Sequence, residues 1–158
     1  MPDYDLIVIG GGPAGMMAAA RAGERGRRVL LLERGPSLGR KLLITAGGRC
    51  NVTNSALLPE FLNAFGRQGG FLRDAMTRFG NTELLEWLHQ RGVRTIEERK
   101  GRVFPESQQA ATVLDALRAY LQSGGVEIRL NQRVESLWIE QGALRGARAE
   151  ECGVRSLN

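Results

Sequence analysis

A short apolar run that ends in closely spaced glycines constrains this chain more than any other feature. Residues 4–34 are YDLIVIGGGPAGMMAAARAGERGRRVLLLER. Leu6 to Ile9 is apolar and β-branched, which favours a buried parallel strand. Gly26 ends the helix that we expect next, and a second apolar run leads to Glu33. The order of strand, turn, helix and strand predicts a βαβ unit.

The turn of this unit has the pattern G-x-G-x-x-G at Gly10, Gly12 and Gly15. The first glycine permits the tight turn, the second lets the backbone approach a pyrophosphate, and the third lets the helix pack closely on the strand. Pro13 falls in the first helical turn, where its missing N–H has no cost. The N–H groups at the start of the helix, including that of Ala14, would face phosphate.

Glu33 ends the second strand roughly 20 residues beyond the glycines, where dinucleotide-binding folds place an acid that binds ribose hydroxyls. The alternative is a βαβ unit whose glycines serve its turns only. The ADP half of the ligand is common to NAD and FAD, so this unit alone leaves both cofactors open.

The segment after Glu33 favours the longer cofactor. A plain NAD fold would enter another helix within a few residues, whereas here a glycine-rich stretch, GRKLLITAGGRCNVTN, covers residues 39–54. Gly47 and Gly48 allow close backbone approach, and Arg40, Lys41 and Arg49 can balance phosphates. Neutral hydrogen-bonding groups suited to the edge of a flavin ring come from Thr45, Asn51, Thr53 and Asn54.

Three segments, DLIVIGGGPAG, GRKLLITAGGRCNVTN and GRVFPESQQA, resemble the bacterial aminoacetone-oxidase-like FAD-binding flavoproteins, also named NAD(P)/FAD-dependent oxidoreductases. That family lies in the glutathione-reductase-like FAD superfamily, and some members are linked to bile-acid reduction. The similarity covers about residues 3 to 140. Ala46 is a departure, since the family more often has glycine there, which would restrict the loop locally.

The resemblance implies an α/β fold: a Rossmann-like FAD-binding domain of the glutathione-reductase type, a ββα sandwich with a β-meander. It implies a flavoenzyme that transfers hydride or electrons between a small organic substrate and NAD(P)H or oxygen. The implied cofactor-binding residues are Gly10, Gly12, Pro13, Ala14, Gly15, Glu33, Arg34, Lys41, Thr45, Gly47, Gly48, Arg49 and Asn51.

No catalytic acid or base emerges from the sequence. Cys50 beside Arg49 could be a reactive thiol, but no partner cysteine is near, so we expect a buried structural cysteine. His89, the single histidine, is expected late in a helix in a structural role. The two cysteines, Cys50 and Cys152, have no metal-ligand spacing and fit a reducing cytoplasm.

Further helices and strands are expected after Leu57. Two short helices should cover 57–80, with one apolar face formed by Phe71, Leu72, Ala75, Met76 and Phe79. Asn81 should cap a helix through Gln90, and two strands should join through Lys100 and Gly101. Ser107 should cap a helix with Ala110, Val113, Leu114, Leu117 and Leu121 inward, followed by a strand over 126–131 and a hairpin turning at Gln141 and Gly142.

This pattern divides the chain into an N-terminal part of a FAD-binding domain, 1–145, and an atypical tail, 146–158. The first part comprises a βαβ unit with the flavin loop (1–56), a helical and hairpin insertion (57–106), and a helix, strand and hairpin (107–145). The family's later segments do not follow, so we expect a truncated domain.

Composition leaves other functions open. The chain of 158 residues has a net charge of +5, of which residues 1–57 supply +4, around the glycine-rich loops. A nucleic-acid partner is not expected, because no basic run is interleaved with aromatics. The alternatives are an NAD-dependent dehydrogenase domain, an RNA-associated protein and a truncated inactive product. No segment is long enough to span a membrane, and we expect a cytoplasmic protein.

Overall fold

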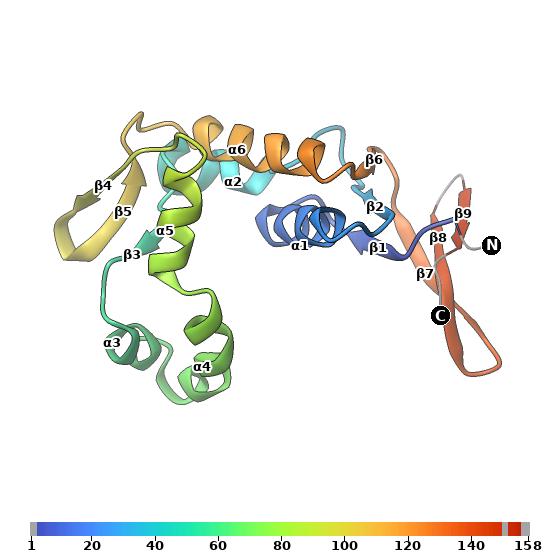
Figure 1. Cartoon of the computed structure of the whole chain (residues 1–158), viewed down its shortest axis with the longest axis horizontal. Helices are drawn as coiled ribbons and strands as arrows, with labels where there is room; N and C mark the ends of the chain where they lie inside the picture. Colours follow the sequence, from blue (N-terminus) through green and yellow to red (C-terminus); the bar gives the residue numbers. More distant parts are fainter. Residues whose placement is uncertain (1–2, 150–151, 156–158) are drawn as a thin grey trace. The chain divides into compact units, whose positions relative to one another are not determined.

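The computed structural model describes residues 3–149 and 152–155, and it divides into two compact units. Unit 1 holds residues 1–42 and 117–158, and unit 2 holds residues 43–116. The insertion expected at 57–106 lies within unit 2. Figure 1 labels the helices and strands of both units, and each unit is described by itself below.

Unit 1 is built on a parallel sheet of three strands in the order β1-β2-β6. The strands are β1 (Leu6–Ile9), β2 (Val29–Leu32) and β6 (Glu127–Arg129), and Leu6 pairs with Val29 while Leu30 pairs with Glu127. Every residue of β2 is buried, as expected for the central strand of a parallel sheet. The predicted βαβ unit and the third parallel strand are therefore confirmed. The burial predicted for the first strand is wrong, because Leu6 and Ile9 are exposed and the two residues between them are only half-buried.

Helix α1 (Pro13–Glu24) contacts β1 and β2 and buries Met16, Ala19 and Ala20. A Cβ added at Gly23 would overlap the carbonyl oxygen of Gly124, so the end of α1 meets the segment after α6 (Ala110–Ser123) at backbone distance. The inward residues predicted for α6 are all buried: Ala110, Val113, Leu114, Leu117 and Leu121.

An antiparallel sheet of three strands follows in unit 1, in the order β7-β8-β9. Its strands are β7 (Val134–Glu140), β8 (Ala143–Ala149) and β9 (Cys152–Arg155). Gln141 and Gly142 join β7 to β8, both with positive φ (51° and 77°), which is the geometry of a type I′ turn. The predicted hairpin is confirmed, and a third strand extends it into a β-meander.

Unit 2 contains a small antiparallel sheet with the order β3-β5-β4. Its strands are β3 (Thr53–Asn54), β4 (Thr95–Glu98) and β5 (Arg102–Pro105), and a 3₁₀ turn at Arg99–Gly101 joins β4 to β5 as predicted. The other elements are α2 (Arg40–Ile44), η1 (Thr45–Gly48), α3 (Leu58–Asn63), η2 (Gly66–Gln68), α4 (Gly69–Arg78) and α5 (Asn81–His89). Helix α2 begins in unit 1 and ends in unit 2, whereas helix α6 begins in unit 2 and ends in unit 1.

Two predicted helix caps are wrong. The N-cap of α5 is Gly80, whose N–H donates to the Glu83 carboxylate (2.8 Å), while the Asn81 amide donates to the carbonyl oxygens of Asn54 and Ala56. Asn81 thus ties α5 to the segment after β3. Helix α6 begins at Ala110, three residues after Ser107, whose hydroxyl oxygen accepts a bond from the N–H of Gln109.

The apolar face predicted on α4 does not face the core of unit 2. Phe71 is 88% exposed and Phe79 43% exposed, and Ala75 is exposed as well. Only Leu72 and Met76 are half-buried. The helical spacing was right, but spacing alone does not say what covers a face.

Candidate functional site

The glycine turn after β1 has the backbone that the motif requires. Gly10 has φ +100°, a conformation open to glycine, and its N–H donates to the carbonyl oxygen of Leu32 (2.8 Å). A Cβ added at Gly15 would overlap the carbonyl oxygen of Gly10. Glycine at 15 therefore lets α1 start directly against the turn.

The start of α1 presents free donors to this turn. Gly12 is the N-cap and has no side chain that could satisfy the first N–H groups, and Pro13 follows at the first helical position. The first turn contains no acidic residue. Because the N–H groups of Ala14 and Gly15 have no partner within a helix, an anion placed here would receive hydrogen bonds and the favourable end of the helix dipole.

The carboxylate of Glu33 is fixed beside the turn by two backbone donors. The N–H of Gly11 donates to Oε2 (2.7 Å) and that of Gly35 donates to Oε1 (2.8 Å). A Cβ on Gly11 would meet the end of the Leu38 side chain and the Glu33 side chain, so a larger residue there would require both to shift. Each carboxylate oxygen keeps lone pairs that can accept hydroxyl hydrogens.

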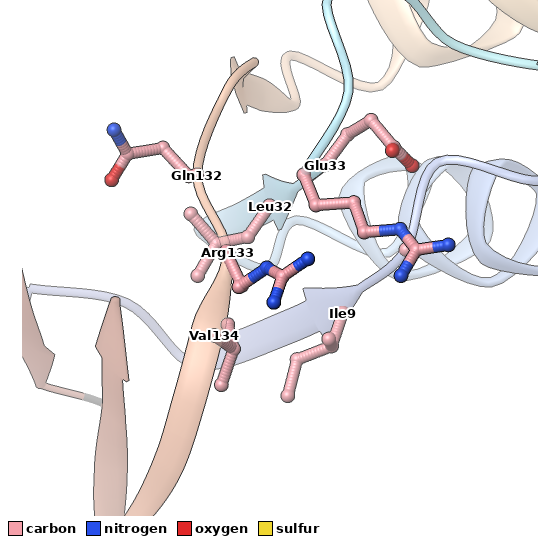
Figure 2. A pocket seen from close by; sticks show the side chains of 8 residues that line it. Ile9, Leu32, Glu33, Gln132, Arg133 and Val134 are labelled. Carbon is pink, nitrogen blue, oxygen red and sulfur yellow. The ribbon is translucent and has the colours of Figure 1, made fainter. Parts of the chain in front are cut away.

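A cavity of about 290 Å³ lies beside Glu33 at the carboxyl ends of β1 and β2 (Figure 2). Its lining is Ile9, Gly10, Leu32, Glu33, Arg34, Gln132, Arg133 and Val134. Residues 131–133, which we call the strap, are held against the end of β2. The N–H of Gln132 donates to the Glu33 carbonyl (2.9 Å) and that of Asn131 to the Gly35 carbonyl (3.0 Å).

The flavin loop predicted at 39–54 lies partly in unit 1 and partly in unit 2. Lys41 is in unit 1 and exposed, whereas Thr45, Gly47, Gly48, Arg49 and Asn51 are in unit 2. Ala46, Gly47, Gly48 and Cys50 all have positive φ (49°, 66°, 90° and 63°). Ala46, where the resembling family favours glycine, therefore adopts a conformation that costs a side-chain-bearing residue energy.

Arg49, expected on the pyrophosphate and flavin side, makes its described contacts with unit 2 itself. Its guanidinium donates to Glu98 Oε1 (2.8 Å) and Gln108 Oε1 (2.8 Å) and lies 4.2 Å from the centre of the Phe104 ring. The amide nitrogen of Asn51, assigned from its hydrogen-bonding neighbours, donates to the carbonyl oxygens of Val103 (3.2 Å) and Thr53 (3.0 Å). Arg49 therefore fastens the loop to β4 and β5, and Asn51 fastens it to β3 and β5.

Comparisons with known proteins agree with this geometry. The family model described as "HI0933-like protein Rossmann domain" matches residues 4–154. This chain belongs to that family. Among curated relatives, the ribosomal RNA dihydrouridine synthase of Escherichia coli is 36% identical over 87% of this chain, and the 3-dehydro-bile acid delta(4,6)-reductase of Clostridium scindens is 37% identical over 82%. These matches cover 34% and 32% of the two relatives, so the chain spans about a third of their length.

Solved structures confirm the fold of this HI0933-like domain. The 3-ketosteroid-delta4-(5alpha)-dehydrogenase from Rhodococcus jostii has a TM-score of 0.74 and 19% identity, with 99% of this chain and 45% of that chain covered. The predicted Rossmann-like α/β fold of the FAD-binding type is confirmed. The finer assignment to the aminoacetone-oxidase-like family is not confirmed.

The described residues of this HI0933-like domain fit the ADP half of FAD. The Gly10–Gly15 turn leaves room for a pyrophosphate at the start of α1, and Glu33 is oriented to accept ribose hydroxyls. The adjoining cavity has space for a flat base. These features lie within unit 1.

Sequence reasoning missed the strap and Ile9 as parts of this cavity. The signal was present, because Gln132 and Arg133 follow the strand over 127–129, and the carboxyl ends of parallel strands share one edge of a sheet. Ile9 was assigned to the buried strand, yet it is 55% exposed at the cavity.

The structure supports the structural roles expected for Cys50 and His89. The Cys50 side chain is buried, and burial raises the pKa of its thiol, with a hydrogen bond to Thr45 acting in the opposite direction. A raised thiol pKa opposes nucleophilic reactivity. His89 Nε2 lies 2.8 Å from the Thr95 hydroxyl and so joins α5 to β4.

Proposed function

We propose that this chain is the FAD-binding part of an oxidoreductase that transfers hydride or electrons, through FAD, between a small organic substrate and NAD(P)H or oxygen. The observation that carries this proposal is the Glu33 carboxylate, held by Gly11 and Gly35 beside the glycine turn and the start of α1. That arrangement suits an ADP-containing cofactor, and membership of the HI0933-like family favours FAD over NAD alone.

Each part of the site has a separate task in this proposal. The N–H groups of Ala14 and Gly15 bind pyrophosphate, Glu33 orients the ribose, and Arg34 contacts the adenine end. Lys41, Thr45, Gly47 and Gly48 are assigned to the pyrophosphate and flavin side, and Arg49 and Asn51 hold that loop in shape. FAD, when bound, would supply reversible hydride transfer. No described residue is assigned as a catalytic acid or base.

The names of the two curated relatives describe reactions that involve the saturation of a carbon–carbon double bond. Dihydrouridine differs from uridine by saturation of the C5–C6 double bond, and a delta(4,6)-reductase saturates carbon–carbon double bonds of a steroid acid. In uracil this bond is conjugated to a carbonyl, which makes one carbon electrophilic. We therefore propose reduction of a double bond conjugated to a carbonyl, with a hydride from NAD(P)H on one carbon and a proton from solvent on the other.

Several finer assignments are also proposals. They include the aminoacetone-oxidase-like subgroup, NAD(P)H as electron donor and a cytoplasmic location. The RNA in one relative's name makes RNA a substrate to be tested, although the sequence argued against a nucleic-acid partner. No helix in the described part of the chain is long and apolar enough to cross a membrane.

The test is anaerobic NADPH oxidation by the protein that contains this chain, followed at 340 nm. Parallel reactions contain a 3-oxo-Δ4 steroid acid, a uridine-containing ribosomal RNA, or a saturated steroid as control. We expect oxidation with one unsaturated substrate and a product that is heavier by two hydrogens in mass spectrometry. Equal rates with the saturated control would contradict double-bond reduction.

A further inference from the structure

The cavity beside Glu33 combines an apolar floor with two arginines. Ile9 is 55% exposed although it ends a parallel strand, and Leu32 and Val134 add apolar atoms to the same lining. Arg34 follows β2, and Arg133 lies in the strap that precedes β7. Apolar side chains beside planar guanidinium groups suit a flat aromatic ring, because such a ring can stack on both.

Backbone hydrogen bonds of the strap fix the position of the Arg133 main chain. Asn131 has φ +57°, which turns the strap around the end of β2, and the two bonds to the carbonyl oxygens of Glu33 and Gly35 hold it there. Arg133 follows Gln132 directly, and Val134 then packs against the core of Tyr4, Leu30 and Leu32. In Figure 2 the Arg133 side chain extends toward the end of β1, where Ile9 lies.

We propose that Arg133 stacks on the adenine ring of the bound cofactor and sets the preference of this domain for an adenine nucleotide. This rests on the proposed function, since it assumes a cofactor with an ADP half. Arg133 is a positioning residue that holds one end of the cofactor and leaves the chemistry to the other. A role in binding a further phosphate fits less well, because Glu33 lines the same cavity and its carboxylate would repel that group.

The experiment is calorimetric titration of the full 158-residue chain with ADP and with UDP. The variants are Arg133→Leu, which removes the guanidinium, and Arg133→Lys, which keeps the charge without the planar group. Arg27→Leu is the control for net charge, because Arg27 is exposed after α1, at the opposite end of the strands. Thermal melting of each variant checks its folding.

We expect Arg133→Leu to weaken ADP binding by about twofold to thirtyfold, the range for a cation–π contact. Arg133→Lys should weaken it by less, because an ammonium can still lie over the ring but cannot stack on it as a plane. The affinity for UDP, whose smaller ring stacks less, should change by less than about twofold. The preference for ADP over UDP should therefore fall in both variants. Arg27→Leu should leave both affinities unchanged.

Two results would overturn the inference. If Arg133→Leu binds ADP as tightly as the wild type, Arg133 does not contact the base. If Arg133→Lys binds ADP as tightly as the wild type, the planar guanidinium is not needed and Arg133 does not stack on the base. Either result would reject the role of Arg133 and leave the proposed function intact. A wild-type chain that binds neither ADP nor FAD would contradict the role of Arg133 and the proposed function together.

Discussion

The N–H of Gly11 donates to Oε2 of Glu33 at 2.7 Å, across 22 positions of the chain. This bond joins the glycine turn after β1 to the acid that ends β2, so two sequence motifs become one site. The second carboxylate oxygen is held by the N–H of Gly35. Glu33 is thereby oriented before any ligand arrives, which reduces the entropy cost of binding.

Substituting Glu33→Gln should weaken ADP and FAD binding by about tenfold. The Gln amide has one acceptor oxygen, so its nitrogen would face one of the two backbone donors, and a ribose hydroxyl would lose an acceptor. Calorimetry with ADP measures the loss. Glu106→Gln, on an exposed residue of unit 2, should bind ADP as the wild type does; unchanged affinity in Glu33→Gln would rule out its role.

Two glycines of the turn should respond differently to alanine. Gly15→Ala should lower the free energy of unfolding by about 1–3 kcal/mol, because its Cβ would overlap the Gly10 carbonyl and force the backbone to shift. Gly12→Ala should fold normally, since Gly12 has φ −77° and open space around it, yet it should weaken pyrophosphate binding. Chemical denaturation and ADP titration separate the two effects. A Gly15→Ala chain as stable as Gly12→Ala would contradict the close packing.

Ala46→Gly should raise the free energy of unfolding by about 1 kcal/mol. Ala46 has φ +49°, a left-handed conformation that costs an alanine roughly 1–2 kcal/mol, part of which glycine returns through its freer unfolded state. Ala75→Gly is the matched control, because Ala75 is exposed within α4 and the same exchange there should destabilise by about 1 kcal/mol. Urea denaturation compares them; destabilisation in both would show that Ala46 is not strained.

Cys50 should react slowly with a disulfide reagent at neutral pH. Burial raises the pKa of its thiol and shields the sulfur, so the thiolate is scarce in the folded chain. Since the pKa is raised on folding, the neutral thiol contributes stability below its unfolded pKa, and this is lost as pH rises through the folded pKa. Reaction of a Cys152→Ser chain, with and without denaturant, measures the shielding. Equal rates would contradict a buried Cys50.

The parallel sheet and its glycine turn were predictable because their causes are local. Leu6 to Ile9 and the run ending at Glu33 have the composition of strands, and the glycines between them fix the turn. Only the second strand is buried, since burial depends on what covers a strand. Gln141 and Gly142 likewise specify a tight hairpin from two residues. In such places the residues nearby in the sequence determine the backbone conformation.

The parts that sequence did not reveal depend on distant partners. Arg49 was expected to balance a phosphate, but Glu98 and Gln108, 49 and 59 positions away, receive its hydrogen bonds. Asn81 is a good helix cap by type, yet carbonyl oxygens near β3 engage its amide. Arg133 joins Arg34 only because the strap turns around the end of β2. No local pattern encodes these tertiary contacts.

The measurement that tests the central claim most directly is the visible absorption spectrum of the purified and dialysed chain, before and after addition of FAD. A chain of full family length is recorded beside it. We predict retained flavin bands near 370 and 450 nm in the chain incubated with FAD, and their loss in the Glu33→Gln, Gly12→Ala double variant. One result would contradict a FAD-binding domain. In that result the folded chain retains no flavin at either length, and adding the chain to reduced nicotinamide changes the nicotinamide fluorescence.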